Sequence, residues 1–462
     1  MLIGLSQFII SADYNLIFVA LPAVGHDLHL AGQALQLVVV AYAATFAGCV
    51  LLAGRATDVL GARRVFTLGA ALFGATSILG AVASTGWMLI AARGAQGIAA
   101  AALFPSGLAL VIGTFPAGPA QRRALAIWGS AGAVGMSVGS LLGGALTTAL
   151  GWRAVLLVNV PAAAAAAIGT ARLIRPGHRR RPRRSLDLAG SLAALIGLSC
   201  LVVVLVLGPK VGWEPSALWL PAASALCAGA AFVVVELRAK DPVLPRRRLS
   251  LTLGSTAAVT FVLLGLLSSA FYVLTLYLQN VAGYTALETG LGLLPLTAAM
   301  VVGMQCGSRL VGRGGPRLLA VLGQLAMGAA IAWVGIVLAA PHPYVHLALP
   351  LTLFGLGGGI TWTAAFTTAA ADADGAEYGL VASVICAARQ VGSAAVVAAL
   401  TPIIAADGTD PAAQAGGHTG LQAAAYASAG LSLLGAAAAF GLDVPPHRGR
   451  QHSRRGAHGA QV

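Results

Sequence analysis

The chain has 462 residues, of which 58% are hydrophobic, 9% are charged and 6% are aromatic, and its formal net charge is +14. Soluble globular proteins carry about 25% charged residues, so this composition excludes a water-soluble fold. A spanning helix needs about 20 apolar residues and a connection, so the length allows about fourteen helices and no large soluble domain.

Long apolar runs predict an all-α integral membrane protein. The runs are continuous and rich in Ala, Leu and Gly, without the alternation of a membrane barrel, so we expect helices that satisfy their own backbone hydrogen bonds. We predict fourteen transmembrane helices near residues 1–23, 33–54, 65–83, 87–112, 123–149, 154–174, 189–208, 216–236, 254–278, 290–311, 317–339, 345–370, 379–404 and 420–442.

The basic residues lie in alternate connections, which is a topology signal rather than a sign of nucleic-acid binding. Of the 28 lysines and arginines, 24 fall on one side of the predicted membrane, while Arg153 and Lys210 fall on the other and Arg93 and Arg389 lie within spans. We therefore expect a multi-pass protein of the cell (plasma) membrane with both termini in the cytoplasm. The lipid bilayer is its predicted surrounding, and we expect no nucleic-acid partner.

The longest basic stretch follows the sixth predicted helix and divides the chain. We interpret it as a solvated linker, and binding to anionic lipid headgroups stays open as a second role. The predicted organisation is an N-terminal six-helix bundle at 1–174, a basic cytoplasmic linker at 175–188, two inserted helices at 189–236, a linker at 237–249, a C-terminal six-helix bundle at 250–442 and a disordered tail at 443–462.

Three ionisable residues lie within spans: Asp13, Arg93 and Arg389. A charge in the bilayer is costly, so each of them indicates function by default. Asp13 is the only acid well inside a span and could take up and release a proton, although a static partner for an arginine is the alternative. Each arginine must face a watery cavity, a carboxylate or a substrate, or else pin a helix end.

Helix five carries Gly135, Gly139 and Gly143 at four-residue spacing, followed by Gly144. Such a stripe lets another helix approach closely. The spacing leaves static packing and a sliding interface between two halves equally open.

Motifs for other chemistries are missing from the sequence. There is no GxxxxGK[ST] run for an ATP-driven pump, and the five cysteines show no CxxC spacing. No paired carboxylates or nucleophile–base pair occur at recognisable spacing. We therefore expect no cofactor, no metal site and no enzymatic activity.

Several motifs occur in a fixed order along the chain. They are QFIISADYNLIFVALP with Asp13, GRATDVLGARR with Gly54, Asp58, Gly61, Arg63 and Arg64, then Arg93 with Gln96 and Gly97, GSLLGG at 139–144, Gly151-Trp152-Arg153, Asn159-Val160-Pro161 and, later, Arg389-Gln390 with Gly392. In this order and spacing, the sequence resembles the major facilitator superfamily over nearly the whole chain. It is most similar to the fourteen-helix drug–proton antiporter branch of EmrB/QacA type.

The resemblance implies a major facilitator fold: two six-helix bundles that rock about a midplane site, with two extra helices inserted between them. It implies proton-driven export, with Asp13 as the proton acceptor and Arg93 as the group that tunes its proton affinity. Two further roles follow the motifs: a gating loop of Gly54, Asp58, Gly61, Arg63 and Arg64, in which Asp58, Arg63 and Arg64 form a cytoplasmic latch, and an inter-domain helix with Gly135, Gly139, Gly143 and Gly144. The candidates for lining a substrate cavity are Tyr14, Phe18, Tyr42, Phe271, Tyr272, Trp362 and Arg389, and the alternative for the aromatic residues is a place in the core.

The expected substrate is a small amphipathic molecule that is neutral or monocationic, because Asp13 alone cannot both offset a dication and carry the proton. We expect the chain to act as a monomer. Ser140 stands where the family motif has proline, which keeps a proton symporter or uniporter of the same fold open. A non-transporting scaffold or receptor is the alternative from another class, but it would leave the cost of Asp13 and Arg93 unexplained.

Overall fold

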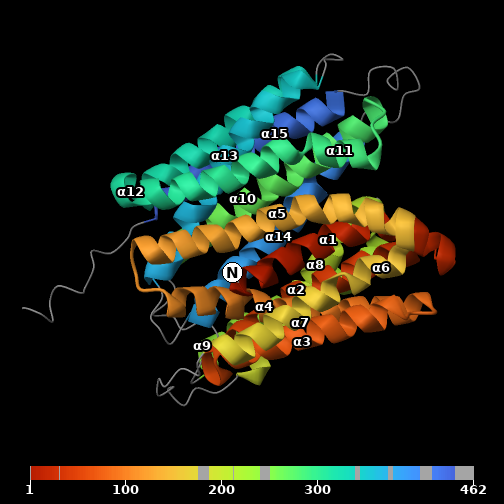
Figure 1. The fold of residues 1–462 in the computed structure, drawn as a ribbon, viewed down its shortest axis with the longest axis horizontal. Coiled ribbons are helices and arrows are strands. Elements are labelled where there is room, and N and C mark those ends of the chain that lie inside the picture. The colour runs from red at the N-terminus through yellow and green to blue at the C-terminus, as the bar shows by residue number, and fades with distance from the viewer. Residues whose placement is uncertain are drawn as a thin grey trace, which may run out of the picture.

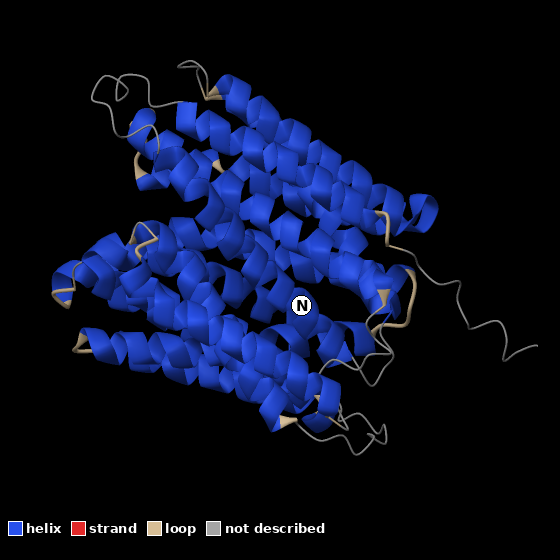
Figure 2. Ribbon diagram, turned by 180° about the vertical axis from the view of Figure 1, so that it is seen from behind, coloured by secondary structure: helices blue, strands red, loops and turns tan. Residues whose placement is uncertain are grey.

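The computed structural model describes residues 2–30, 32–174, 187–211, 213–239, 250–338, 344–372, 378–405 and 419–442. Within these ranges the chain forms long helices (Figure 1) and no strand (Figure 2). The helices are α1 (Leu2–Asp27), α2 (Gly32–Leu60), α3 (Ala62–Ala81), α4 (Gly86–Thr114), α5 (Pro119–Leu150), α6 (Trp152–Leu157), α7 (Asn159–Leu173), α8 (Leu188–Leu207), η1 (Gly208–Lys210), α9 (Pro215–Arg238), α10 (Leu251–Leu276), η3 (Tyr277–Val281), α11 (Ala286–Gly292), α12 (Leu294–Val337), α13 (Val345–Asp372), α14 (Tyr378–Ala405) and α15 (Thr419–Ala439).

The described helices provide fourteen membrane spans, as predicted. Twelve helical segments among the described residues are long and apolar enough to cross a bilayer. One of them contains α12, whose 44 residues would extend about 66 Å, roughly twice the apolar thickness of a membrane. Gly315 breaks this helix with a φ of 74° directly before Pro316, so α12 is two spans, and the 26-residue α1 adds the last.

Two bundles of six spans form the body of the protein. The first bundle contains α1 to α7, with α6 and α7 sharing one span, and the second contains α10 to α15, with α12 supplying two. The inserted helices lie at the edge of the first bundle, because α8 packs on α2 and α9 packs on α8. The predicted fold is therefore confirmed.

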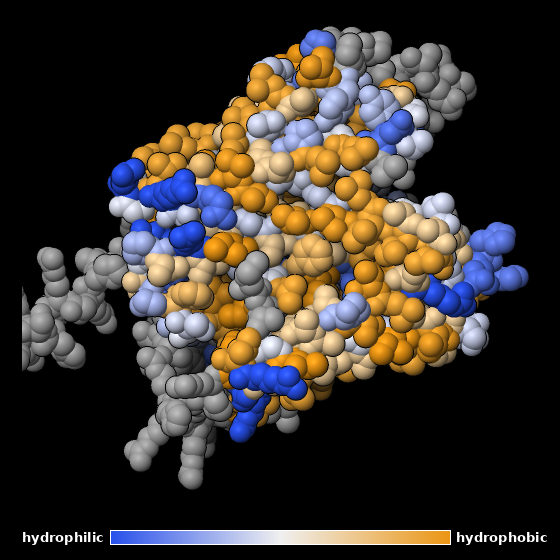
Figure 3. Space-filling model, viewed as in Figure 1, coloured by the Kyte–Doolittle hydropathy of each residue, from blue (hydrophilic) through white to orange (hydrophobic). Residues whose placement is uncertain are grey.

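The outer surface suits a lipid environment. Large apolar side chains point outward, among them Leu68 at 66%, Trp87 at 74% and Leu226 at 76% exposure. Figure 3 shows hydrophobic residues over the middle of the molecule and hydrophilic residues toward both ends of its long axis. Exposed apolar area of this extent is unfavourable in water and favourable in a membrane.

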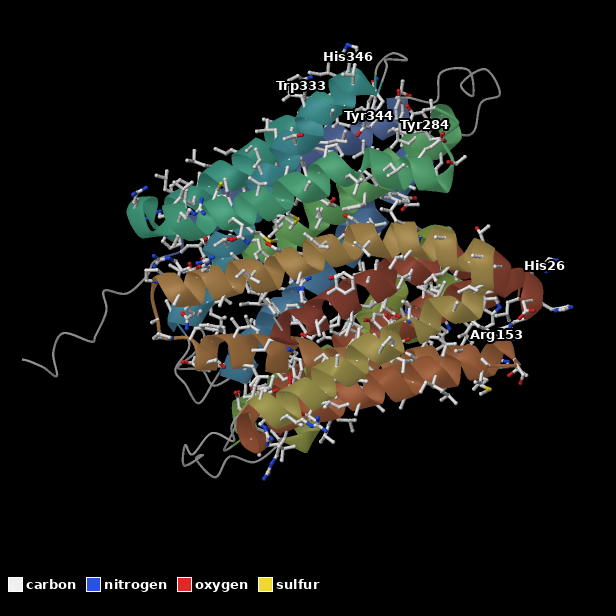
Figure 4. The ribbon with its side chains drawn as sticks, in the orientation of Figure 1. His26, Arg153, Tyr284, Trp333, Tyr344 and His346 are labelled. Carbon is white, nitrogen blue, oxygen red and sulfur yellow. The ribbon has the colours of Figure 1, made fainter. Side chains whose placement is uncertain are left out.

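The bundles contact each other through α5 with α12, and through α14 with α2 and α4. We call the end where α2 terminates and where α5 and α14 begin the basic end. At the opposite end, Figure 4 places His26 and Arg153 on one bundle and Tyr284, Tyr344 and His346 on the other, and Figure 3 shows a hollow between them. The bundles therefore diverge away from the basic end.

The predicted domain boundaries stay predictions. The linkers fall largely on residues 175–186 and 240–249, and the tail on 443–462, all outside the described residues.

Candidate functional site

Asp13 lies in the middle of α1 and is only 1% exposed. Its carboxylate accepts three side-chain hydrogen bonds: Oδ2 from Arg93 Nη1 at 2.7 Å, Oδ1 from Gln96 Nε2 at 3.0 Å and Oδ1 from Asn159 Nδ2 at 2.7 Å. The three donors are buried as well. Helices α1, α4 and α7 thus converge on one carboxylate inside the first bundle.

The local sequence explains how these donors reach Asp13. Arg93 and Gln96 are three residues apart on α4, so they share one helix face, and Arg93 Nη1 also donates to Gln96 Oε1 at 2.5 Å. Ser77 on α3 accepts a hydrogen bond from Gln96 Nε2 at 2.9 Å and so orients the amide. Asn159 is the first residue of α7, beyond the break that separates it from α6.

Arg93 and Asp13 form a salt bridge in which both side chains are 1% exposed. The Arg93 guanidinium lies 4.4 Å from the ring centroid of Tyr42, and its Nε and Nη2 have no hydrogen-bond partner among the described residues. Removing either charge would leave the other buried without compensation, which is strongly unfavourable. Protonation of Asp13 would have the same electrostatic effect, because it cancels one charge of the pair.

Asp58, near the end of α2, joins the two bundles at the basic end. Its Oδ1 accepts a hydrogen bond from the backbone N–H of Gly379 at 2.7 Å, and its Oδ2 accepts one from that of Leu380 at 2.9 Å. Both amides lie in the first turn of α14, where N–H groups are free and negative charge is favoured. Gly54, one turn earlier on α2, lies so close to α14 that an added Cβ would stand 2.5 Å from Ser383.

The remaining residues of the predicted gating loop stay within the first bundle. Gly61 precedes α3 with a φ of 96°, a conformation that favours glycine. Arg63 donates from Nη2 to the backbone oxygen of Ala171 on α7 at 2.5 Å, and Arg64 is exposed. Among the described residues, Asp58 is the only one of the three predicted latch residues that forms a hydrogen bond to the second bundle.

The glycine stripe of α5 requires a correction. An added Cβ at Gly135 or Gly139 would stand 2.5 Å from a backbone oxygen of α1, so both glycines allow tight packing inside the first bundle. Gly143 is buried and Gly144 is half-buried. The prediction that the stripe forms the inter-domain surface is therefore wrong for Gly135 and Gly139, because the sequence spacing does not tell which helix packs on it.

Gly129 of α5 faces the second bundle. An added Cβ there would clash with the indole ring of Trp362 on α13. Gly129 lies outside the regular four-residue spacing, so the sequence pattern missed it.

The predicted cavity residues differ in how far their side chains are exposed. Tyr14 is 39% exposed, whereas Tyr42 is buried beneath Arg93. Phe271 and Tyr272 on α10 are half-buried, and the side chain of Phe18 lies outside the described ones. Tyr42 contacts the Asp13 network through the Arg93 guanidinium.

Arg389 and Trp362 meet at the interface between the bundles. The Arg389 guanidinium lies 4.5 Å from the ring centroid of Phe104 and 5.0 Å from that of Trp362. Trp362 stacks on Phe366 with ring centroids 4.0 Å apart, and Trp128 lies 6.2 Å from Trp362. We call Phe104, Trp128, Trp362 and Phe366 the aromatic cluster.

Sequence reasoning missed several residues of these sites. Gln96 and Asn159 were noted only as parts of motifs, and Ser77 was not noted at all. Phe104, Trp128 and Phe366 carried no signal, because aromatic residues in spans usually belong to the core. Their grouping depends on the packing of three different helices, α4, α5 and α13.

Comparisons with known proteins identify related sequences over most of the chain. Residues 3–397 match the Major Facilitator Superfamily. The cephamycin export protein CmcT of Amycolatopsis lactamdurans is 36% identical over 421 residues, which cover 90% of this chain and 86% of that protein. The puromycin resistance protein pur8 of Streptomyces alboniger is 35% identical over 454 residues, which cover 95% and 89%. The crystal structure of the human organic anion transporter MFSD10 (TETRAN) matches at a TM-score of 0.69 and 17% identity, covering 96% of this chain and 98% of that one, and this likeness shows the fold alone.

Proposed function

The chain belongs to the major facilitator superfamily, and we propose that it exports small amphipathic molecules across the cell membrane in exchange for protons. Relatives at 35–36% identity carry names of export and resistance proteins, which favours export over import. The observation that carries the proton-coupling part is the fully buried Asp13–Arg93 pair. A membrane protein retains such a pair at high desolvation cost, and a scaffold or receptor would have no use for it.

The proton step follows from the geometry of Asp13. In the observed arrangement, its carboxylate is the acceptor of all three hydrogen bonds, which requires the deprotonated form for full pairing with Arg93. A proton arriving at Asp13 cancels its charge and weakens its bond to Arg93. The packing of α1, α4 and α7 around the carboxylate must then readjust, and this readjustment couples the proton to the movement of the first bundle.

The gating step follows from Asp58. The positive-inside rule assigns the basic end to the cytoplasm, so on this assignment the Asp58 contacts hold the two bundles together on the cytoplasmic side. Opening the cytoplasmic side requires Asp58 to release the two amides of α14. We propose that the protein alternates between this conformation and one that is open to the cytoplasm, with the substrate bound between the bundles.

The test is substrate-dependent proton movement in proteoliposomes that contain the purified full chain and a pH-sensitive dye. Puromycin and a cephamycin are the first compounds to try, because they appear in the names of relatives. We expect their addition to change the internal pH, and we expect a protonophore to abolish their uphill transport. Transport that continues unchanged after the proton gradient is collapsed would contradict antiport.

A further inference from the structure

Arg389 is a cation without a counter-ion among the described residues. No hydrogen bond or ion pair joins its guanidinium to the described part of the chain, and its Nε is buried without a partner. Arg93 differs, because Asp13 neutralises it at 2.7 Å. An uncompensated charge inside a membrane protein is costly, so its retention indicates a ligand that supplies the missing negative charge.

The position of Arg389 suits a substrate site. Arg389 on α14, Phe104 on α4, Trp128 on α5 and Trp362 on α13 each lie about ten residues from the basic end of their helices, or about 15 Å at 1.5 Å per residue. This depth is about half of the apolar thickness of a bilayer. Two of these helices belong to each bundle, so the site lies near the midplane between the moving halves.

The surroundings of Arg389 leave its hydrogen-bonding capacity unused. The rings of Phe104 and Trp362 interact with the guanidinium through their π electrons and take up none of its N–H groups. A guanidinium presents a planar set of donors that matches the two oxygens of a carboxylate. The aromatic cluster beside it offers apolar surface for the rest of a ligand.

We propose that Arg389 and the aromatic cluster form a subsite for the anionic group, most simply a carboxylate, of an otherwise apolar substrate. This inference rests on the export function proposed above and specifies its substrate class. It differs from the neutral or monocationic substrate that the sequence predicts, because that prediction treated Asp13 as the free charge of the cavity. The structure pairs Asp13 with Arg93 and leaves positive charge at the interface.

The test compares two probes with the same aromatic body, 1-naphthylacetate and the uncharged 1-naphthylacetamide. Their equilibrium binding is measured on the full chain in lipid nanodiscs of zwitterionic lipid. We expect the carboxylate to bind at least about tenfold more tightly, as charge-assisted hydrogen bonds typically give. Acetate alone should not compete at equal concentration, and effective competition by acetate would indicate a site for free small anions and overturn the proposal.

Three variants assign the charge preference to Arg389. Arg389→Gln should bind both probes with the weak affinity of the amide, and Arg389→Lys should retain part of the preference, since it keeps the charge but loses the planar donors. Arg317→Gln is the matched control, because Arg317 also lies over a ring, 4.8 Å from the centroid of Phe440, but outside the interface. Unchanged binding of 1-naphthylacetamide to Arg389→Gln shows that this variant is folded. If Arg389→Gln does not fold, Arg389→Lys is compared with the wild-type chain instead.

The outcomes separate this inference from the proposed function. Equal binding of the two probes to the wild-type chain, including no detectable binding of either, overturns the subsite, as does a carboxylate preference that survives in Arg389→Gln. Preferential carboxylate binding without proton-coupled transport supports the subsite and contradicts antiport. Proton-coupled transport of both probes at equal rates supports antiport and overturns the subsite.

Discussion

The Asp13→Asn variant tests the coupling mechanism most directly, and the structure predicts its effect on stability as well as on transport. Oδ2 of Asp13 accepts a hydrogen bond from Arg93, while Oδ1 accepts two from amide groups. Asparagine has one oxygen and one NH2 group, so a donor must face a donor in either rotamer. The variant also leaves the 1%-exposed Arg93 side chain without its counter-charge. Breaking a buried pair in this way costs about 3–5 kcal/mol.

The companion variant removes both charges. Arg93→Gln alone strands the carboxylate and should cost a similar amount, whereas Asp13→Asn with Arg93→Gln leaves two amides that can hydrogen-bond to each other. We therefore expect the double variant to be more stable than either single variant, with a coupling energy of about 2 kcal/mol or more. Proton-coupled transport should be lost in all three.

The assays are equilibrium unfolding of the purified proteins in detergent and substrate-dependent proton flux in proteoliposomes. Additive stability losses would show that the two side chains do not form a significant ion pair. Proton flux at the wild-type rate in Asp13→Asn would remove Asp13 from the mechanism, whatever the stability of the variant.

Three further predictions address the gate, the helix packing and the topology. Asp58→Ala should lower turnover by about tenfold with little change in apparent substrate affinity, because it removes two bonds that must break when the cytoplasmic side opens in the proposed cycle; wild-type turnover would contradict the latch. Gly139→Ala should destabilise the chain by about 1–3 kcal/mol, as its Cβ meets a backbone oxygen of α1, whereas Gly229→Ala, with nothing within 4 Å, should be neutral in the same unfolding assay. A cysteine at Asp407 should react with an impermeant reagent added to intact cells and a cysteine at Arg180 should not, and labelling at Arg180 would reverse the assigned orientation.

The fold could be predicted from the sequence because membrane spans are set by length and hydrophobicity, both of which are read directly from the chain. The predicted spans 290–311 and 317–339 even left a gap at the position where Gly315 breaks α12. The break between α6 and α7 could not be predicted, since residues 154–174 read as one apolar run. That break depends on tertiary packing, which brings Asn159 at the start of α7 to Asp13.

The candidate site was only partly predictable. Charged residues could be recognised from the sequence because burying a charge is costly, whereas uncharged polar residues could not. Asp13, Arg93 and Arg389 stand out because a charge in an apolar span is rare and expensive. Uncharged polar residues such as Ser77 and Asn159 are common in spans, so their sequence positions carry little information about function. The pairing of Arg93 and the lack of a described partner for Arg389 depend on which helices meet, and the sequence does not contain this directly.

Helix α4 offers a physical link between the two charged sites. Arg93 and Phe104 lie on this helix about three turns apart, and they contact Asp13 and Arg389 respectively. A change in protonation at Asp13 acts on α4 through Arg93 and Gln96, and any resulting shift of α4 moves Phe104 relative to Arg389 on the second bundle. Exchange transport needs a coupling free energy between the proton site and the substrate site, and a stiff helix that contacts both can carry it. On this argument the proton and the anionic group need not compete for one residue, because Asp13 holds the first and Arg389 binds the second.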